Sequence, residues 1–429
     1  MRFHLLAFLP LALSTVLPRD DAVDYEGYEA FRINTHGDGG AVKTQLSSID
    51  YKQWNYRVDQ HLDIAVPAED CAKFKQLGLE WEQMHKNLGQ SIREEKQWKK
   101  YPGRKPDELP DDSWFDSYHP YEDHKSFWED LHAAFPKNSK MISSGTSVQG
   151  RDLFGLKLYG SGNHNVQKPA IIWHSNVHAR EWITSMTVEY IAYQLIEGYG
   201  GCKGSKPDAE VQSLLDTYDF YLIPFVNPDG FVYSQEVDRL WRKNRSSPPP
   251  GANQTCYGTD VNRNWPWKWN VIRFGSSPDP CEEDYRGEAP GDTPENQGMT
   301  AFIDSIAKEQ PIKFYVDWHS YGQYILTPHG WSCKIVAENS EEQVDLAEEV
   351  QEVIASVHGT NFTYGPICET LYAVNGGSTD YVYDIAGAEY SWAFEVRDEG
   401  KFGFVLPKRF IRPVGEEMWE GVKYAIANM

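Results

Sequence analysis

Residues 170 to 182 read AIIWHSNVHAREW, and this stretch decides the fold. Its first six residues form an apolar run, which is typical of a strand buried in the middle of a sheet. Directly after that run, His178, Arg180 and Glu181 place three ionisable side chains within four residues. Because ligand sites in open α/β sheets lie at the carboxyl ends of the strands, the stretch predicts a buried strand that ends at a functional site.

Similar apolar runs alternate with helical patterns along the chain from about residue 113. We predict further buried strands in residues 218–230, 312–320 and 389–396, and helices over residues 182–199, 295–310 and 340–359. This alternation predicts an α/β domain with a twisted, mixed and mostly parallel central sheet flanked by helices. His319 and Glu395 stand at the ends of two of these strands, as His178 and Glu181 follow the first.

The chain before residue 113 has a different pattern. Alternating residues in 28–34 and 61–67 predict strands, and residues 67–84 have helical spacing, so residues 24–91 are expected to form a small α+β unit. Residues 93–114 are charged, rich in proline and poor in apolar side chains, which is typical of an exposed linker.

The linker contains two basic pairs, Lys99-Lys100 and Arg104-Lys105, where a trypsin-like protease could cut. A cut linker would make the first unit a removable pro-segment. We therefore expect a pro-segment with its linker in residues 18–112 and a catalytic domain in residues 113–429.

The first residues indicate the compartment. Residues 1–17 combine a positive start at Arg2 with an apolar run that is too short to span a bilayer, which is typical of a secretory signal peptide. No other segment has the apolar length of a membrane span. The net charge of −22 argues against nucleic-acid binding, because a phosphate backbone would repel such a surface. The triplets at Asn244, Asn253 and Asn361 could carry glycans on a secreted chain.

The ionisable residues after the strands suggest a metal site. A catalytic zinc ion usually has three protein ligands and one open position. His178 and Glu181 form a His-x-x-Glu pair, and His319 offers a third ligand from another strand end. Two imidazoles and a carboxylate are a known ligand set of hydrolytic zinc enzymes, but a His-x-x-Glu pair alone is weak evidence.

Six motifs taken together are far more specific. In chain order they are HAREW (178–182), RLWRKNR (239–245), GTDVNRNW (258–265), DWHSYG (317–322), YAVNGGSTDY (372–381) and WAFEVRDEGKFGFVLP (392–407). Their order and spacing resemble those of the zinc metallocarboxypeptidases, most closely the secreted A/B subfamily with a pro-segment, the pancreatic type and its fungal relatives. The resemblance covers nearly the whole chain, since residues 66–92 also look like that subfamily's pro-segment.

The resemblance implies a role for each matching residue. It makes His178, Glu181 and His319 the ligands of one zinc ion, Glu395 the general base and proton shuttle, and Arg242 the group that polarises the scissile carbonyl. It implies that the remaining matches bind the substrate or orient a ligand: Asn262 and Arg263 at the free carboxylate, Tyr372 closing over it, Arg180 and Tyr321 further along the groove, and Asp260 behind the first zinc histidine. The implied partners are peptide and protein C-termini and an activating trypsin-like protease, for a protein that works as a monomer.

The resemblance also implies which residues form the specificity pocket for the C-terminal side chain. Basic-specific members carry an aspartate one residue after the serine of GGSTDY, and this chain has Thr379 there. Gly330, Ile367 and Ala393 match other wall positions and are small or apolar. We therefore expect an A-type preference for aromatic and aliphatic C-terminal residues, because such a pocket rewards apolar burial. The alternatives are a basic-specific B-type enzyme and, less favoured because Glu395 is retained, a silent peptide-binding pseudoenzyme.

The six cysteines fit a secreted protein. The resemblance implies two disulfides, Cys256–Cys281 and Cys333–Cys368. Cys71 and Cys202 are left over, and a bridge between them is a hypothesis that would hold a cleaved pro-segment on the enzyme until reduction.

Overall fold

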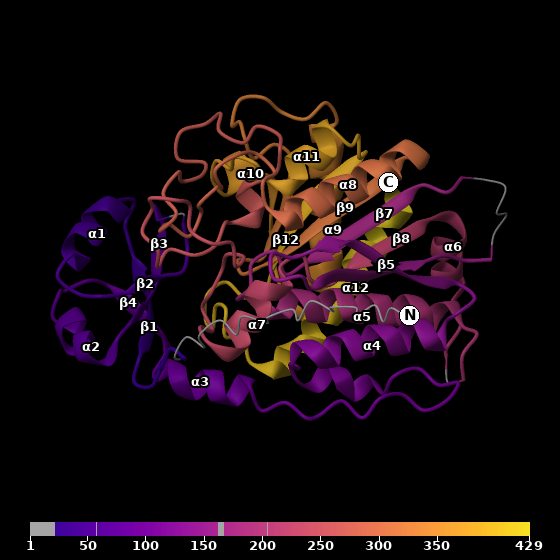
Figure 1. Ribbon diagram of the computed structural model, residues 1–429, viewed down its shortest axis with the longest axis horizontal. Coiled ribbons are helices and arrows are strands. Elements are labelled where there is room, and N and C mark those ends of the chain that lie inside the picture. Colours follow the sequence, from indigo (N-terminus) through magenta and orange to yellow (C-terminus); the bar gives the residue numbers. More distant parts are fainter. Residues whose placement is uncertain (1–21, 57, 162–166, 204) are drawn as a thin grey trace, which may run out of the picture.

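The computed structural model describes residues 22–56, 58–161, 167–203 and 205–429. The expected signal peptide in residues 1–17 lies outside these residues. The described chain forms a smaller N-terminal unit (residues 22–95) and a larger C-terminal unit (residues 112–429), which lie side by side and are joined by a connecting segment, residues 96–111 (Figure 1).

A mixed sheet forms the centre of the C-terminal unit and confirms the predicted α/β fold. In the described residues it has eight strands in the order β11-β10-β12-β9-β7-β8-β6-β5. Their bounds are β5 Ser139–Thr146, β6 Asp152–Leu158, β7 Ala170–Ser175, β8 Asp219–Ile223, β9 Ile312–Ser320, β10 Tyr324–Thr327, β11 Thr363–Pro366 and β12 Tyr390–Val396. The central strands β8, β7, β9 and β12 run parallel, so their carboxyl ends meet at one edge.

Helices cover both faces of this sheet (Figure 1). Apolar side chains of α4 (Tyr121–Ala134), α5 (Trp182–Tyr199), α9 (Ser340–His358) and α12 (Ile411–Asn428) form the main core on one face, and those of α8 (Pro294–Glu309) and α11 (Ser378–Asp384) pack on the other. The shorter helices are α6 (Ala209–Thr217), α7 (Pro228–Glu236), α10 (Ile367–Thr370), η1 (Asp112–Asp116), η2 (Val261–Arg263) and η3 (Lys408–Phe410). The helix α5 is the best example of a sequence-based prediction, since its bounds match the predicted helix.

The N-terminal unit is an antiparallel sheet with its first two helices on the outer face and its third helix packed towards the C-terminal unit (Figure 1). The strand order is β2-β3-β1-β4, with β1 Glu29–Asn34, β2 Lys52–Gln53, β3 His61–Val66 and β4 Trp81–His85, and the helices are α1 Gly39–Leu46, α2 Ala68–Lys75 and α3 Leu88–Glu95. Alternate residues of each strand face opposite sides. Phe31 therefore packs against Phe74 of α2, whereas its neighbour Ala30 faces a second core, which contains Trp54 together with Leu240 and Phe404 of the C-terminal unit.

Two expectations for this region need correction. The helix predicted over residues 67–84 is wrong in its second half: α2 ends at Lys75, and the rest turns at Gly78 (φ 72°) into strand β4. The connecting segment is also less exposed than its composition predicts. Tyr101 donates from Oη to Asp130 at 2.9 Å and packs edge-on against Trp114, so the segment lies along the C-terminal unit.

Four of the six cysteines form disulfides, and two are free. Among the described residues, Cys256–Cys281 and Cys333–Cys368 form disulfides, and Cys71 and Cys202 are free thiols. The hypothesis of a Cys71–Cys202 bridge is therefore wrong: α2 and the loop after α5, which carry these residues, lie at opposite ends of the molecule (Figure 1). No helix in the described part of the chain is long and apolar enough to cross a membrane.

Candidate metal centre and substrate cleft

The three predicted metal ligands converge at the carboxyl ends of neighbouring strands. Strand β7 ends at Ser175, and Asn176 turns the chain in the left-handed conformation (φ 51°) that asparagine tolerates. His178 and Glu181 follow in the tight turn before α5, and His319 lies near the end of the adjacent strand β9. One ligand atom from each of the three residues lies within 4.8 Å of the others, and all three are buried.

The hydrogen bonds of the two imidazoles show that this group suits a cation. Nε2 of His178 lies 3.1 Å from Asp260, and Nε2 of His319 lies 2.9 Å from Asp317. A carboxylate accepts the ring proton, so the opposite nitrogen of each ring carries a lone pair. These two Nδ1 atoms lie 3.1 Å apart, at 3.0 Å (His178) and 3.2 Å (His319) from the Glu181 carboxylate. Such close lone pairs repel one another unless a cation lies between them, so the arrangement fits a shared divalent cation. Two imidazole nitrogens and a carboxylate are a donor set that fits zinc.

The buried carboxylates of the centre stay charged because cationic groups surround them. Burial alone would raise the pKa of Asp317, but His319 and His174 lower it to about 2. Burial would likewise raise the pKa of Asp260, yet Arg242 and His178 hold it well below its usual range. The charged forms are the ones that can fix the histidine tautomers.

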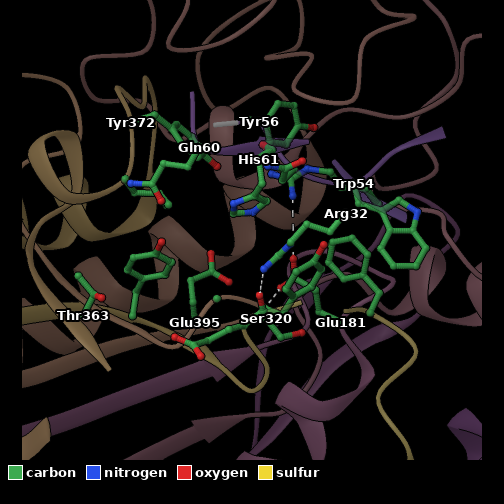
Figure 2. A pocket seen from close by; sticks show the side chains of 18 residues that line it. Arg32, Trp54, Tyr56, Gln60, His61, Glu181, Ser320, Thr363, Tyr372 and Glu395 are labelled. Carbon is green, nitrogen blue, oxygen red and sulfur yellow. Dashed lines mark hydrogen bonds and ion pairs between the residues drawn. The ribbon is translucent and has the colours of Figure 1, made fainter. Parts of the chain in front are cut away.

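Glu395 lies beside this centre, at the end of β12 and paired in register with His319 on β9. Figure 2 shows its side chain among the residues that line the cavity next to Glu181. Burial raises the pKa of Glu395 to about 8, with His319 opposing the rise and Glu181 adding to it. A divalent cation on the neighbouring ligands would favour the ionised carboxylate and lower this pKa.

The opposite side of the site carries positive charge. Arg242 donates from Nη2 and Nε to Asp260 at 2.8 and 3.1 Å. Asn262 and Arg263 line a small cavity together with His319 and Glu395, and Tyr372 accepts from Arg263 at 3.4 Å. The predicted carboxylate-binding residues are therefore gathered next to the metal centre.

One wall of that small cavity is apolar, and polar side chains such as those of Arg263 and Glu395 line the rest. Leu326, Ile367, Val374 and Ala393 form one apolar cluster, and Thr379 also lines the cavity. Gly330 packs behind this wall, since a Cβ there would come within 3.1 Å of Val374.

Asp380 also lines this cavity, so it could be taken for the acidic residue that selects a basic C-terminal side chain, but its oxygens already have partners. Its carboxylate accepts the amides of Gly330 and Trp331, and burial raises its pKa to about 7.

Arg180 and Tyr321 contact the N-terminal unit instead of a free groove. Arg180 donates to the carbonyl oxygen of Trp54 at 3.3 Å, and the Tyr321 hydroxyl donates to Asp63 at 2.7 Å. A cavity of about 430 Å³ remains between the two units, and Tyr321 is among the residues that line it. Figure 2 shows Glu395 on one side of this cavity and Tyr56 on the other.

Sequence reasoning missed Asp317, although a signal for it exists. Residues i and i+2 of a strand face the same side, so Asp317 had to lie on the side of His319 once residues 312–320 were assigned as a strand. It also missed the N-terminal residues at the cleft, such as Tyr56 and Asp63, because their contacts join segments more than a hundred residues apart.

Comparisons with known proteins agree with this geometry. The sequence pattern of the zinc carboxypeptidase family matches residues 124–421. A metallocarboxypeptidase A-like protein of Trichophyton verrucosum is 42% identical over 434 residues, which cover 99% of this chain and 98% of the relative. Carboxypeptidase A2 of Mus musculus is 36% identical over 72% of this chain and 69% of its own. The crystal structure of thrombin activatable fibrinolysis inhibitor superposes with a TM-score of 0.84 at 28% identity, over 94% of this chain and 99% of the other.

Proposed function

Because this chain belongs to the zinc carboxypeptidase family and is a metallocarboxypeptidase acting on peptides, we propose that it is secreted as a zymogen and prefers aromatic and aliphatic C-terminal residues. The observation that carries the proposal is the convergence of His178, Glu181 and His319 beside Glu395 at the end of a pocket that combines Arg263 with apolar walls.

Each side chain of the site has a chemical task in this proposal. His178, Glu181 and His319 would hold zinc, which supplies Lewis acidity to the scissile carbonyl and lowers the pKa of a bound water. Glu395 accepts a proton from the attacking water and then delivers it to the leaving amine, a task that suits a carboxylate whose pKa burial raises above its usual range.

Two cationic groups and an amide orient the substrate. The guanidinium of Arg263 pairs with the free carboxylate of the peptide end, because its planar fork matches a carboxylate in bidentate geometry. Asn262 adds a hydrogen bond there, and Tyr372 closes over the bound end. Arg242 stabilises the negative charge that develops on the carbonyl oxygen.

The A-type preference rests on the pocket walls. A side chain entering between Ile367, Val374 and Ala393 buries apolar surface, which contributes about 25 cal/mol per Å². Thr379 brings no charge that could pair with a lysine or arginine, so the B-type alternative lacks a selector. Asp380 does not replace it, because its oxygens already accept two backbone amides.

The zymogen proposal is supported by the contacts of the N-terminal unit with the cleft. The ring of Tyr56 stands over Arg242 at 5.1 Å and packs against Tyr372 at 6.1 Å. Arg180 and Tyr321 donate hydrogen bonds to the carbonyl oxygen of Trp54 and to the carboxylate of Asp63, so these donors are already engaged. A long substrate cannot bind these groups while the N-terminal unit holds them, so a cut in the connecting segment is needed for full activity.

The test is a comparison of the secreted protein before and after trypsin treatment. Peptides that differ only in a C-terminal Phe, Leu, Lys or Glu are assayed with and without a chelator. We expect activity on the Phe and Leu peptides, a large rise after trypsin, and loss with the chelator that zinc restores. Faster release of Lys would favour the B-type alternative, and trypsin-treated protein that binds zinc without cleaving any peptide would favour the pseudoenzyme.

A further inference from the structure

The three potential glycosylation triplets differ sharply in their surroundings. Asn244 is completely buried, and its Nδ2 donates to Glu295 at 3.0 Å. Its Oδ1 accepts the amides of Ser246 and Thr259 at 3.1 and 2.8 Å. An amide nitrogen that is enclosed and hydrogen-bonded in this way is closed to modification in the folded chain.

Asn361 has the opposite environment. It is exposed, and it lies between α9 and β11, an edge strand of the large sheet. Its carbonyl oxygen accepts from Nε2 of Gln323 at 2.8 Å, and the amide of Thr363 donates to the carbonyl of Gln323 at 2.9 Å. The main chain is therefore fixed while the side chain is open to solvent. This exposure holds with the N-terminal unit in place, which is the form that passes through a secretory pathway.

Asn361 is also next to the opening of the substrate cleft. Thr363 lines the cavity of about 430 Å³ between the units, as do Gly322 and Tyr324, the two neighbours of Gln323 (Figure 2 labels Thr363). Residues two apart in an extended chain are separated by at most about 7 Å. A group attached to Asn361 therefore stands at the rim of the cleft.

We propose that Asn361 carries an N-linked glycan that hinders folded proteins from reaching the cleft but leaves short peptides unhindered. The donor is a lipid-linked oligosaccharide pyrophosphate. Nδ2 of Asn361 forms the new bond to C1 of the first sugar and loses one proton, and the bond from C1 to the pyrophosphate oxygen breaks. The inference rests on the proposed secretion, because such donors act in the secretory pathway.

Asn253 provides a matched control on the same chain. It is exposed, in a loop where its Oδ1 accepts from Oγ1 of Thr255 at 2.9 Å. Neither cavity described above is lined by residues 249–257. The substitution N253Q therefore removes a surface triplet outside the lining of both cavities, whereas N361Q removes the one at the rim.

The experiment uses the full chain secreted from a glycosylating yeast. Mass spectrometry of peptides after enzymatic deglycosylation is expected to find a former glycan at Asn361 and none at Asn244. After trypsin activation, kcat/KM is measured on a short peptide and on a folded protein with the same C-terminal residue. We expect N361Q to raise the value for the protein by up to about tenfold, since hindered approach acts on the association rate, with the peptide value and the N253Q variant unchanged. Native deglycosylation of the unsubstituted enzyme should have the same effect as N361Q.

An unmodified Asn361, an occupied Asn244, or an N361Q enzyme with an unchanged ratio of the two kcat/KM values would overturn the proposal. Failure of all forms to cleave the short peptide would instead contradict the proposed function, because glycan occupancy is read from mass and not from activity.

Discussion

A buried ion pair between the two units gives the sharpest prediction for the proposed zymogen. Glu95 of α3 and Arg239 of the C-terminal unit each have a side chain that is only 1% exposed. Nε and Nη2 of the arginine donate to the two carboxylate oxygens at 2.6 and 2.8 Å. Glu95 precedes both basic pairs of the connecting segment, so a cut at either pair separates it from the catalytic domain.

The substitution E95Q keeps the shape of the side chain and removes its charge. Breaking a buried ion pair by removing one partner costs about 3–5 kcal/mol, because the other charge stays buried and unpaired. Arg239 keeps two carbonyl acceptors, those of Arg180 and Phe404, and burial raises the pKa of Glu95 in spite of the arginine. Both facts favour the lower end of this range, a cost of about 3 kcal/mol. That cost shifts the equilibrium from the closed form, in which the N-terminal unit covers the cleft, towards an open form by about 100-fold.

The assay measures the activity of uncut E95Q zymogen on a short peptide, and then the activity after trypsin. We expect the uncut activity to rise by up to about 100-fold, according to the shift above, and the activated enzyme to be unchanged, because it no longer contains residue 95. The matched control is E94Q, which removes a neighbouring charge that is exposed. Uncut E95Q with the low activity of E94Q would refute the reasoning.

Four further predictions concern the site and the stability of the fold. The variant E395Q should lose about 10²–10⁴ in kcat with its zinc content intact by elemental analysis, and zinc loss would contradict a purely catalytic role. D317N should weaken zinc binding about 10- to 100-fold in chelator competition, because His319 loses its partner; unchanged affinity would make Asp317 a packing residue. T379D should shift the ratio of kcat/KM for peptides ending in Lys or Arg to kcat/KM for peptides ending in Phe or Leu about 10- to 100-fold in favour of the basic ends, because the new carboxylate pairs with their charge. An unchanged ratio would show that another residue selects the C-terminal side chain. Burial lowers the pKa of His119 to about 3, and His124 adds to this effect. The neutral ring therefore stabilises the fold above pH 6.5. This contribution to the free energy of unfolding is lost as pH falls towards 3, at about 1.4 kcal/mol per pH unit. Denaturant unfolding of H119Q should show a flatter decline between pH 6 and 4, and an equally steep decline would refute this assignment.

The sequence predicts well those elements whose signal is local. The first four residues of β7 are apolar and all six are buried, and α5 has 15 of its 18 residues buried, so both elements have a strong local signal. The metal ligands follow from their place after such strands and from motifs that fix their spacing. Burial on both sides leaves little choice of register or face for these elements.

Contacts between distant segments are what the sequence does not reveal. Residues 76–84 have the composition of a helix, but pairing with β1 and the packing of Trp81 against Phe31 and Phe74 turn residues 81–85 into a strand. Arg239 lies in a motif that points to the active site, yet its partner Glu95 lies 144 residues earlier. Only the folded chain brings such pairs together.

The way in which the N-terminal unit contacts the cleft indicates what activation requires. Among the described residues, Arg180 and Tyr321, which the resemblance places along the groove, donate hydrogen bonds to Trp54 and Asp63 of the N-terminal unit. The hydrogen bonds of the predicted metal ligands are made only with groups of the C-terminal unit. Under the proposed function, removal of the N-terminal unit therefore exposes a centre that is already assembled. Activation should follow the rate of linker cleavage and dissociation, with no later folding step, and the N-terminal unit should compete more strongly with long substrates than with short ones.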